Sequence, residues 1–372
     1  MAAVKAAIHI SDVSHLDQVN DATAASLSLY ATRLPTGLDG GHNGRKIIPK
    51  FMVVGHRGHG MNILQSTDKR LKAYKENSIL SFNHAANYPL DFIEFDVQVT
   101  KDDTPIIFHD NFILSEENGN IVEKRVTDLT LDEFFSYGPQ RETGQVGKSL
   151  LRNYDGTIVG WNVEIDDHSC TLEEAFQKVN PCLGFNIELK FDDYVVYELE
   201  YLVHVLQVIL KVVHENAQER PVIFSSFQPD AALLMKKLQD KYPVYFLTNG
   251  GTELFDDERM NSLDEAKKLA ISGGLDGVVS EANGIFRNPT VVREIKESNL
   301  SLLTYGNLNN VPEAVHAQYL MGVEGVIVDL VQEITSAVAC LKTGDEGVEV
   351  TENTDKIELS SLLNLVSQVM QH

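Results

Sequence analysis

Residues 92–99 read FIEFDVQV, and this stretch decides the fold because its pattern recurs along the chain. It is short and almost continuously apolar, which is typical of a strand that is covered on both faces and therefore belongs to a parallel sheet. Similar runs are FMVVGH, GFNIEL, VIFSSF, VYFLT, GVVSE, LLTYG and GVIVD, and segments of helical periodicity separate most of them. Eight alternations of strand and helix predict an α/β chain folded as a (β/α)8 TIM barrel. A doubly wound open sheet is the alternative, but eight evenly spaced units favour closure.

One interval breaks this rhythm. Roughly 85 residues separate FIEFDVQV from GFNIEL, and they contain a further short run, PIIFHD. Since a structureless loop of that length is uncommon in a compact domain, we expect a small inserted subdomain at about 110–165, over the mouth of the barrel.

The remaining boundaries follow from composition. We expect an N-terminal extension over residues 1–46, the barrel over 47–342, and an acidic tail over 343–372. The tail contains a short amphipathic segment, LSSLLNLVSQVM, which either packs as a helix or stays mobile.

Net charge limits the partners. The formal charge of −23 argues against nucleic acid and against anionic membrane surfaces, which both favour basic faces. An anionic substrate would therefore need a local source of positive potential. The most apolar helical segment carries Glu198, Glu200, His204 and Lys211, so it predicts an amphipathic helix and no stable membrane insertion.

The first residues bear on targeting. They have no apolar segment of the secretory kind, and Asp12, Asp17 and Asp21 are unusual for a transit peptide. We therefore expect a cytoplasmic location, with a plastid less favoured.

Polar side chains interrupt the predicted strands at their carboxyl ends. Glu94 and Asp96 are two residues apart and share one face of their strand, and Glu188 and Lys190 repeat this spacing. Buried carboxylates without partners are costly, and a set of three suits a hard cation such as Mg²⁺ or Ca²⁺. Each feature alone also has a structural interpretation; Glu188 and Lys190, for example, could form an internal salt bridge. Their joint placement at one rim favours a site.

Two histidines reach the same predicted rim. His56 ends the run FMVVGH and His109 ends PIIFH, so they could serve as an acid–base pair. The surrounding stretch VVGHRGHGMN, residues 53–62, matches neither G-x-G-x-x-G nor a Walker A loop, which argues against a nucleotide site. We expect Gly55 and Gly58 to let the backbone approach a phosphate, and His59 to lie in the loop beyond.

These motifs resemble a known family. GHRG, KENSILSF, DFIEFDVQVTKDDTPIIFHD and FNIELK are similar to the glycerophosphodiester phosphodiesterases over about residues 53–329. The phrase LLTYGNLNN and the long insertion resemble the plant-type, cytosolic branch. The resemblance implies a (β/α)8 barrel with a small insertion and a requirement for Mg²⁺ or Ca²⁺. It also implies hydrolysis of glycerophosphodiesters, such as glycerophosphocholine and glycerophosphoethanolamine, to sn-glycerol 3-phosphate and an alcohol.

The resemblance further implies roles for individual residues. These are the acid–base histidines His56 and His109, the metal ligands Glu94, Asp96 and Glu188, the phosphate-binding residues Arg57 and Lys190, and the supporting residues Glu76, Asn77 and Tyr305. Tyr305 stands where many bacterial members have Trp, which affects the shape of the alcohol pocket. Which histidine is the acid stays open, as does the nucleophile, which is either the glycerol 2-hydroxyl or water.

Two other functions compete with this one. A lysophospholipase D or phospholipase C-like enzyme on the same barrel would need exposed apolar residues at the mouth or a membrane anchor. The sequence indicates neither, although Phe112, Phe134 and Phe135 in the insertion keep this alternative open. A non-catalytic barrel that binds phosphate-containing ligands is disfavoured by the intact set of histidines and carboxylates. A homo-oligomer formed through the two extensions is compatible with either enzyme.

Overall fold

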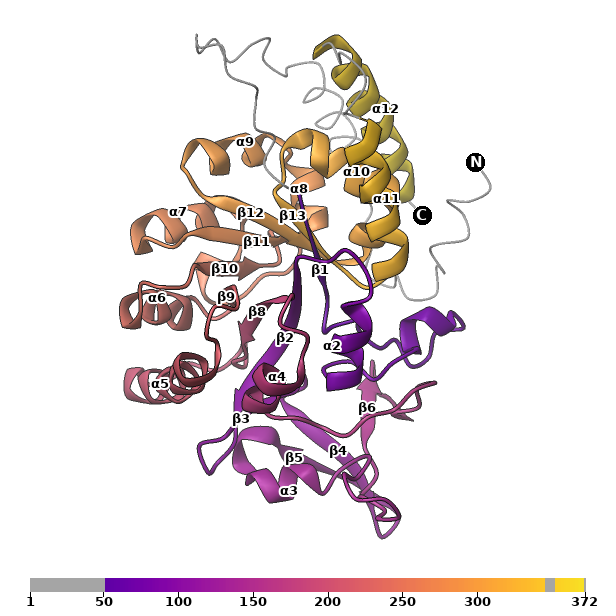
Figure 1. The fold of residues 1–372 in the computed structure, drawn as a ribbon. Coiled ribbons are helices and arrows are strands. Elements are labelled where there is room, and N and C mark those ends of the chain that lie inside the picture. Colours follow the sequence, from indigo (N-terminus) through magenta and orange to yellow (C-terminus); the bar gives the residue numbers. More distant parts are fainter. Residues whose placement is uncertain (1–50, 345–351, 371–372) are drawn as a thin grey trace.

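A closed barrel of parallel strands forms the centre of the molecule (Figure 1). A computed structural model describes residues 51–344 and 352–370; the predicted extension over 1–46 and part of the acidic tail lie outside the described residues. The barrel strands are β1 (Met52–Gly55), β2 (Phe92–Val99), β8 (Gly184–Leu189), β9 (Val222–Ser226), β10 (Val244–Thr248), β11 (Gly277–Glu281), β12 (Ser301–Tyr305) and β13 (Gly325–Val328). Because β1 pairs in parallel with both β13 and β2, the sheet closes. The predicted (β/α)8 barrel is confirmed, and the open sheet is excluded.

Helices surround the barrel (Figure 1). They are α2 (Ile79–Ala85), α4 (Leu172–Lys178), α5 (Leu199–Asn216), α6 (Pro229–Leu238), α7 (Leu263–Gly273), α8 (Ala282–Arg287), α9 (Thr290–Glu297), α10 (Pro312–Met321) and α11 (Val331–Gly344). Helix α4, which precedes β8, was not predicted from the sequence. Its start carries a capping box, in which Thr171 and Glu174 each accept a hydrogen bond from the other's backbone N–H.

The long interval between β2 and α4 contains a second sheet. First β3 (Pro105–Ile107) turns back and pairs antiparallel with β2. The chain then forms an antiparallel sheet with the order β5-β4-β6-β7. Its elements are β4 (Phe112–Glu117), β5 (Asn120–Arg125), β6 (Leu151–Tyr154), β7 (Thr157–Gly160) and the short helix α3 (Leu131–Phe135). A separate apolar cluster that includes Ile106, Phe108, Phe134 and Trp161 holds this sheet together.

The two hairpins of this sheet have turns that the sequence specifies. Asn118-Gly119 joins β4 to β5, and Asp155-Gly156 joins β6 to β7. All four residues have positive φ, which is the conformation that tight two-residue hairpins require and that Asn, Asp and Gly tolerate best.

The amphipathic segment of the tail packs as a helix. It forms part of α12 (Glu352–Met370), which lies against α10 (Figure 1). Leu359, Leu363, Val366 and Met370 recur at helical spacing and are almost completely buried. Across residues 51–344 and 352–370, no helix is both long enough and apolar enough to cross a membrane.

Candidate active site

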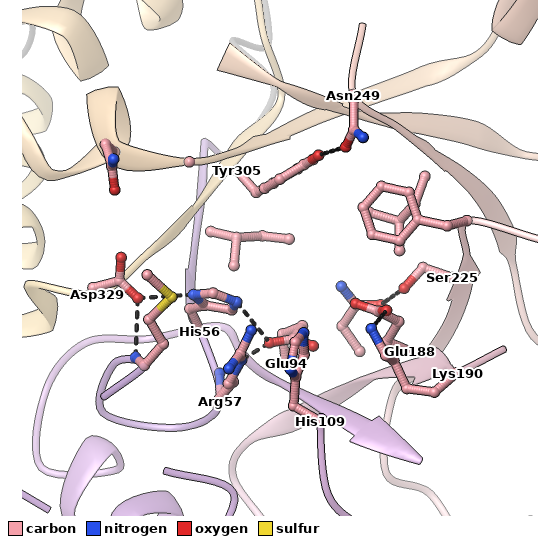
Figure 2. A pocket seen from close by; sticks show the side chains of 17 residues that line it. His56, Arg57, Glu94, His109, Glu188, Lys190, Ser225, Asn249, Tyr305 and Asp329 are labelled. Carbon is pink, nitrogen blue, oxygen red and sulfur yellow. Dashed lines mark hydrogen bonds and ion pairs between the residues drawn. The ribbon is translucent and has the colours of Figure 1, made fainter. Parts of the chain in front are cut away.

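A cavity of about 260 Å³ opens at the carboxyl ends of the barrel strands (Figure 2). Most of the predicted site residues line it, namely His56, Arg57, Glu94, His109, Glu188, Lys190 and Tyr305. Asp96, Glu76 and Asn77 are buried behind this lining and contact it through hydrogen bonds and ion pairs. The position agrees with the rule that sites in this fold lie where the barrel strands end.

Strand register brings the carboxylates together. Asp96 on β2 lies opposite Glu188 on β8, and Glu94 lies opposite Asn186. One oxygen from each of Glu94, Asp96 and Glu188 lies within 4.8 Å of the others. Lys190 lies at the edge of this cluster, with its Nζ 2.9 Å from Glu188 Oε1 and 3.8 Å from Asp96 Oδ1. The salt bridge considered from the sequence is therefore present, within a larger acidic cluster.

The carboxylate cluster has the chemistry of a hard-cation site. Glu94 Oε1 is buried and has no hydrogen-bond partner among the described residues. Burial raises the pKa of Glu94 to about 8, and the nearby Asp96 adds to this shift. A divalent cation would satisfy the unpaired oxygen and remove the repulsion between the carboxylates, and an all-oxygen donor set suits Mg²⁺ or Ca²⁺. The residues present fit such an ion.

Arg57 connects the acidic groups through an unusual backbone conformation. Its φ is +48°, a left-handed conformation that is strained for a residue other than glycine. This conformation directs its N–H at Glu94 Oε2, 2.9 Å away. Its side chain donates to Glu76 Oε1 at 2.8 Å, and its Nε lies 3.4 Å from Asp96 Oδ2. Asn77 also has a positive φ and donates to Asp96 Oδ2 at 2.8 Å.

His56 is oriented by a carboxylate from the opposite end of the chain. Asp329 follows β13, which pairs with β1, and its Oδ1 lies 2.8 Å from His56 Nδ1. His56 Nε2 is left facing Glu94, at 3.9 Å. Burial lowers the pKa of His56, but the charge and hydrogen bond of Asp329 outweigh it, so the pKa is raised above its ordinary value.

His109 reaches the cavity along a different path from the one predicted. It does not follow a parallel barrel strand, because β3 runs antiparallel to β2 and returns the chain beside Asp96. Its Nδ1 lies 2.8 Å from Asp110 Oδ1. Burial lowers the pKa of His109 to about 4, and the positive charges of Arg57 and Lys190 contribute to this shift. The ring is therefore neutral near pH 7.

Sequence reasoning missed three charged residues that hold this site. Asp329 ends the run GVIVD just as His56 ends FMVVGH, so that signal was present. Asp110 is adjacent to His109 and could have been considered its partner. Arg152, on β6, pairs with both Asp110 and Glu76, and no local pattern marks it.

The far wall of the cavity is aromatic and neutral (Figure 2). The Tyr305 hydroxyl donates to Asn249 Oδ1 at 2.5 Å. Phe227 packs edge-on against Tyr305, with ring centroids 5.8 Å apart. Tyr305 and Asn249 lie across the cavity from His56 and Arg57 in Figure 2, and Phe227 lines the cavity beside Tyr305, so these residues define the space beyond the charged groups.

Gly58 in VVGHRGHGMN is required by packing, and the predicted approach of the backbone to a phosphate at Gly55 and Gly58 stays a prediction. A Cβ at Gly58, whose φ is +95°, would lie 2.6 Å from Ser81 Oγ and 2.7 Å from a ring carbon of Phe82, both on α2. His59 does not line the cavity; its ring packs 4.5 Å from that of His84, between centroids.

Comparisons with known proteins identify the family and support the fold. The family model described as "Glycerophosphoryl diester phosphodiesterase family" matches residues 56–333. Glycerophosphodiester phosphodiesterase GDPD2 of Arabidopsis thaliana is 57% identical over 340 residues, which cover 87% of this chain and 91% of the relative. A solved phosphodiesterase of Oleispira antarctica, in complex with sn-glycerol-3-phosphate, has the same fold: the TM-score is 0.55 at 18% identity, covering 78% of this chain and 97% of the other.

The predicted cytoplasmic location is wrong. Glycerophosphodiester phosphodiesterase GDPD1, chloroplastic, of Arabidopsis thaliana is 56% identical over 372 residues, covering 98% of this chain and 99% of the relative. The prediction rests on the missing apolar segment and on three acidic residues near the start, and such composition rules are weak against a match that extends over nearly the whole chain. The resemblance inferred from the motifs, by contrast, is confirmed: the chain belongs to the glycerophosphoryl diester phosphodiesterase family.

Proposed function

We propose that the cavity hydrolyses glycerophosphodiesters to sn-glycerol 3-phosphate and an alcohol, with His109 as the general base and His56 as the general acid. The opposite pKa shifts of the two histidines carry this assignment. His109 is neutral near pH 7 and can accept a proton, whereas Asp329 favours the protonated form of His56. A base and an acid positioned in this way each contribute roughly 10²–10⁴-fold to the rate.

Hydrogen bonds fix the proton-carrying atoms of both rings. Asp110 accepts from Nδ1 of His109, which leaves Nε2 free to take the proton of the attacking hydroxyl. Asp329 likewise holds Nδ1 of His56, so that Nε2 can donate to the departing oxygen. In the overall reaction, water adds across one P–O bond, and the base and acid return to their starting states by exchange with solvent.

Positive charge for the phosphate comes from within the cavity. Arg57 and Lys190 provide it in a chain whose formal charge is −23. Glu94, Asp96 and Glu188 would hold the divalent cation, Mg²⁺ or Ca²⁺, which when bound polarises a phosphoryl oxygen. Glu76 and Asn77 support these groups, Glu76 through Arg57 and Asn77 through Asp96. Tyr305 and Phe227 offer a wall for the part of the substrate beyond the phosphate.

The reaction can be tested with glycerophosphocholine and the purified chain. We expect release of sn-glycerol 3-phosphate that EDTA abolishes and that Mg²⁺ or Ca²⁺ restores. Activity that persists in EDTA would remove the metal role of the three carboxylates. Parallel assays with glycerophosphoethanolamine would rank the head groups.

A lysophospholipid is the second candidate substrate, because apolar side chains are exposed on chain segments that follow β8 and β10, at the end of the barrel where the cavity opens. Tyr194 and Val196, in the loop between Lys190 and α5, are 81% and 98% exposed, and Leu254, after β10, is 81% exposed. The phenylalanines considered from the sequence do not form this surface: Phe134 is buried, Phe135 packs against the same cluster, and the Arg125 guanidinium carbon lies 4.6 Å from the ring centroid of Phe112. Turnover of lysophosphatidylcholine but not glycerophosphocholine would establish this alternative and contradict the first.

We also propose a plastid location, supported by the chloroplastic relative. A fluorescent fusion of the full chain should accumulate in plastids, and removal of residues 1–46 should abolish this accumulation. A diffuse signal from the full-length fusion would contradict the proposal.

A further inference from the structure

Arg152 is a buried arginine that the inserted sheet contributes to the barrel. It lies on β6, and its side chain is only 8% exposed. It does not line the catalytic cavity, so it does not touch the substrate there. Its side chain nevertheless donates to Asp110, Glu76 and the backbone oxygen of Asn62, which adjoin the cavity-lining residues His109, Arg57 and Met61.

One side of the guanidinium supports His109. Arg152 Nε donates to Asp110 Oδ2 and Nη2 donates to Asp110 Oδ1, both at 2.9 Å. Asp110 Oδ1 in turn contacts His109 Nδ1 at 2.8 Å. A bidentate pair of this kind fixes the plane of the carboxylate, and the carboxylate fixes the direction of the imidazole.

The other side supports Arg57. Arg152 Nη2 donates to Glu76 Oε1 at 2.7 Å and Nη1 donates to Glu76 Oε2 at 3.2 Å. Glu76 Oε1 also accepts from Arg57 Nη1 at 2.8 Å. The guanidinium of Arg152 is therefore linked to the general base through Asp110, and to the phosphate-binding Arg57 through Glu76.

The surroundings of Arg152 hold it in place. Its guanidinium carbon lies 4.1 Å from the ring centroid of Trp161, and Trp161 Nε1 donates to Asn62 Oδ1 at 3.2 Å. Arg152 Nη1 also donates to the backbone oxygen of Asn62 at 3.3 Å. Lysine could not replace it, because an ammonium has neither the planar fork nor the face that stacks on an indole.

We propose that Arg152 is a positioning residue for the reaction, through which the inserted sheet orients His109 and Arg57 together. This inference rests on the proposed function, in which His109 takes the proton and Arg57 binds the phosphate. The insertion would then be a required part of the active site as well as a cover for it.

The test compares Arg152→Ala and Arg152→Lys with a matched control, Arg141→Ala. Arg141 also belongs to the insertion, stacks on an aromatic ring (Phe135, 4.0 Å) and forms a two-bond pair with a carboxylate (Glu174), but it has no link to His109 or Arg57. Activity on glycerophosphocholine should be expressed per folded molecule, with folding measured by circular dichroism and thermal melting.

We expect Arg152→Ala to lower kcat through His109 and to raise KM through Arg57, for a combined loss in kcat/KM on the order of 10²-fold, as small misplacements of reacting groups produce. Millimolar guanidinium should restore part of the activity of Arg152→Ala and none of the activity of His109→Ala. Arg152→Lys should remain folded and still be impaired, and Arg141→Ala should retain wild-type kcat and KM.

Two results would overturn the inference. One is a wild-type kcat and KM in folded Arg152→Ala or in folded Arg152→Lys. The other is failure of both variants to fold, because that result would assign Arg152 to stability alone. Failure of the proposed function is distinguishable, since the wild-type chain itself would then leave glycerophosphocholine intact.

Discussion

His56 and Asp329 are 273 residues apart in the chain, yet His56 Nδ1 lies 2.8 Å from Asp329 Oδ1. Closure of the barrel creates this contact, because β1 and β13 are the first and last barrel strands and pair with each other. Asp329 is itself fixed: its Oδ1 accepts from the Met61 N–H at 3.0 Å and its Oδ2 accepts from Asn310 Nδ2 at 2.9 Å. The carboxylate therefore holds the imidazole in one orientation and favours its charged form.

Asp329→Asn should weaken the general acid. Burial lowers the pKa of His56, and the charge of Asp329 opposes this effect. When the charge is removed, the pKa of His56 therefore falls. Since an acid acts only when protonated, the alkaline limb of the kcat profile should move to lower pH. A fall of about one pKa unit would reduce the rate above that limb by up to ~10-fold. The measurement is kcat from pH 5 to 9.

A matched control exists on the surface. His204 Nε2 and Asp103 Oδ1 also lie 2.8 Å apart, but both side chains are more than half exposed. Asp103→Asn should leave the pH profile unchanged. An alkaline limb that stays in place in Asp329→Asn would mean that His56 is not the acid.

His109→Ala should lower kcat by at least ~10²-fold and cost little stability, because the ring borders a cavity and does not belong to an apolar core. The check is kcat together with the melting temperature. His204→Ala removes an exposed ring and serves as the control. A near-normal rate in His109→Ala would remove this residue from the mechanism.

The barrel and most of the cavity lining could be predicted because local patterns encode them. An apolar run marks a barrel strand, and parallel strands all end at one rim, so polar residues such as His56, Glu94 and Glu188 are brought together by topology alone. His109 reaches this rim by another route, since PIIFH contains the antiparallel strand β3 and not a parallel barrel strand. The antiparallel direction of β3 depends on its pairing with β2, and the hydrophobic periodicity of the sequence does not predict this pairing.

What could not be predicted depends on contacts between segments. Arg152 lies 42 residues from Asp110 and 76 from Glu76, in a subdomain whose orientation on the barrel is set by packing. Helix α4 is a different case, because Thr171 and Glu174 have the spacing of a capping box and could have been recognised. The predicted cellular location was wrong because amino-acid composition near a terminus is a weak signal for targeting.

Glu94→Gln should stabilise the metal-free protein. Burial and the neighbouring Asp96 raise the pKa of Glu94 to about 8, so near pH 7 folding requires a proton to bind there, and a neutral side chain of the same shape removes this cost. The same change should reduce the rise in melting temperature that Mg²⁺ or Ca²⁺ produces in the wild type by binding the folded state. Melting curves in EDTA and in each ion measure both effects. Glu116→Gln, at an exposed position on β4, should alter neither. An undiminished response to both ions in Glu94→Gln would exclude Glu94 as a ligand.

His59 should make the protein less stable in mild acid. Its ring packs against His84 and Tyr74, and burial, aided by His84, lowers its pKa to about 4 from an ordinary value of 6.5. The unfolded chain therefore binds a proton more readily than the folded one below pH 6.5. The stability that His59 contributes is present above this pH and is lost progressively as the pH falls toward 4.

Unfolding by urea between pH 7.5 and 4.5 measures this effect. His59→Gln, which cannot titrate, should show a smaller loss of unfolding free energy across that range than the wild type. His204→Gln, which changes an exposed ring, should follow the wild-type curve. Because His59 lies outside the cavity, kcat on glycerophosphocholine at pH 7.5 should stay within about twofold in His59→Gln. An equal loss of stability in His59→Gln and the wild type would show that other groups cause the acid sensitivity.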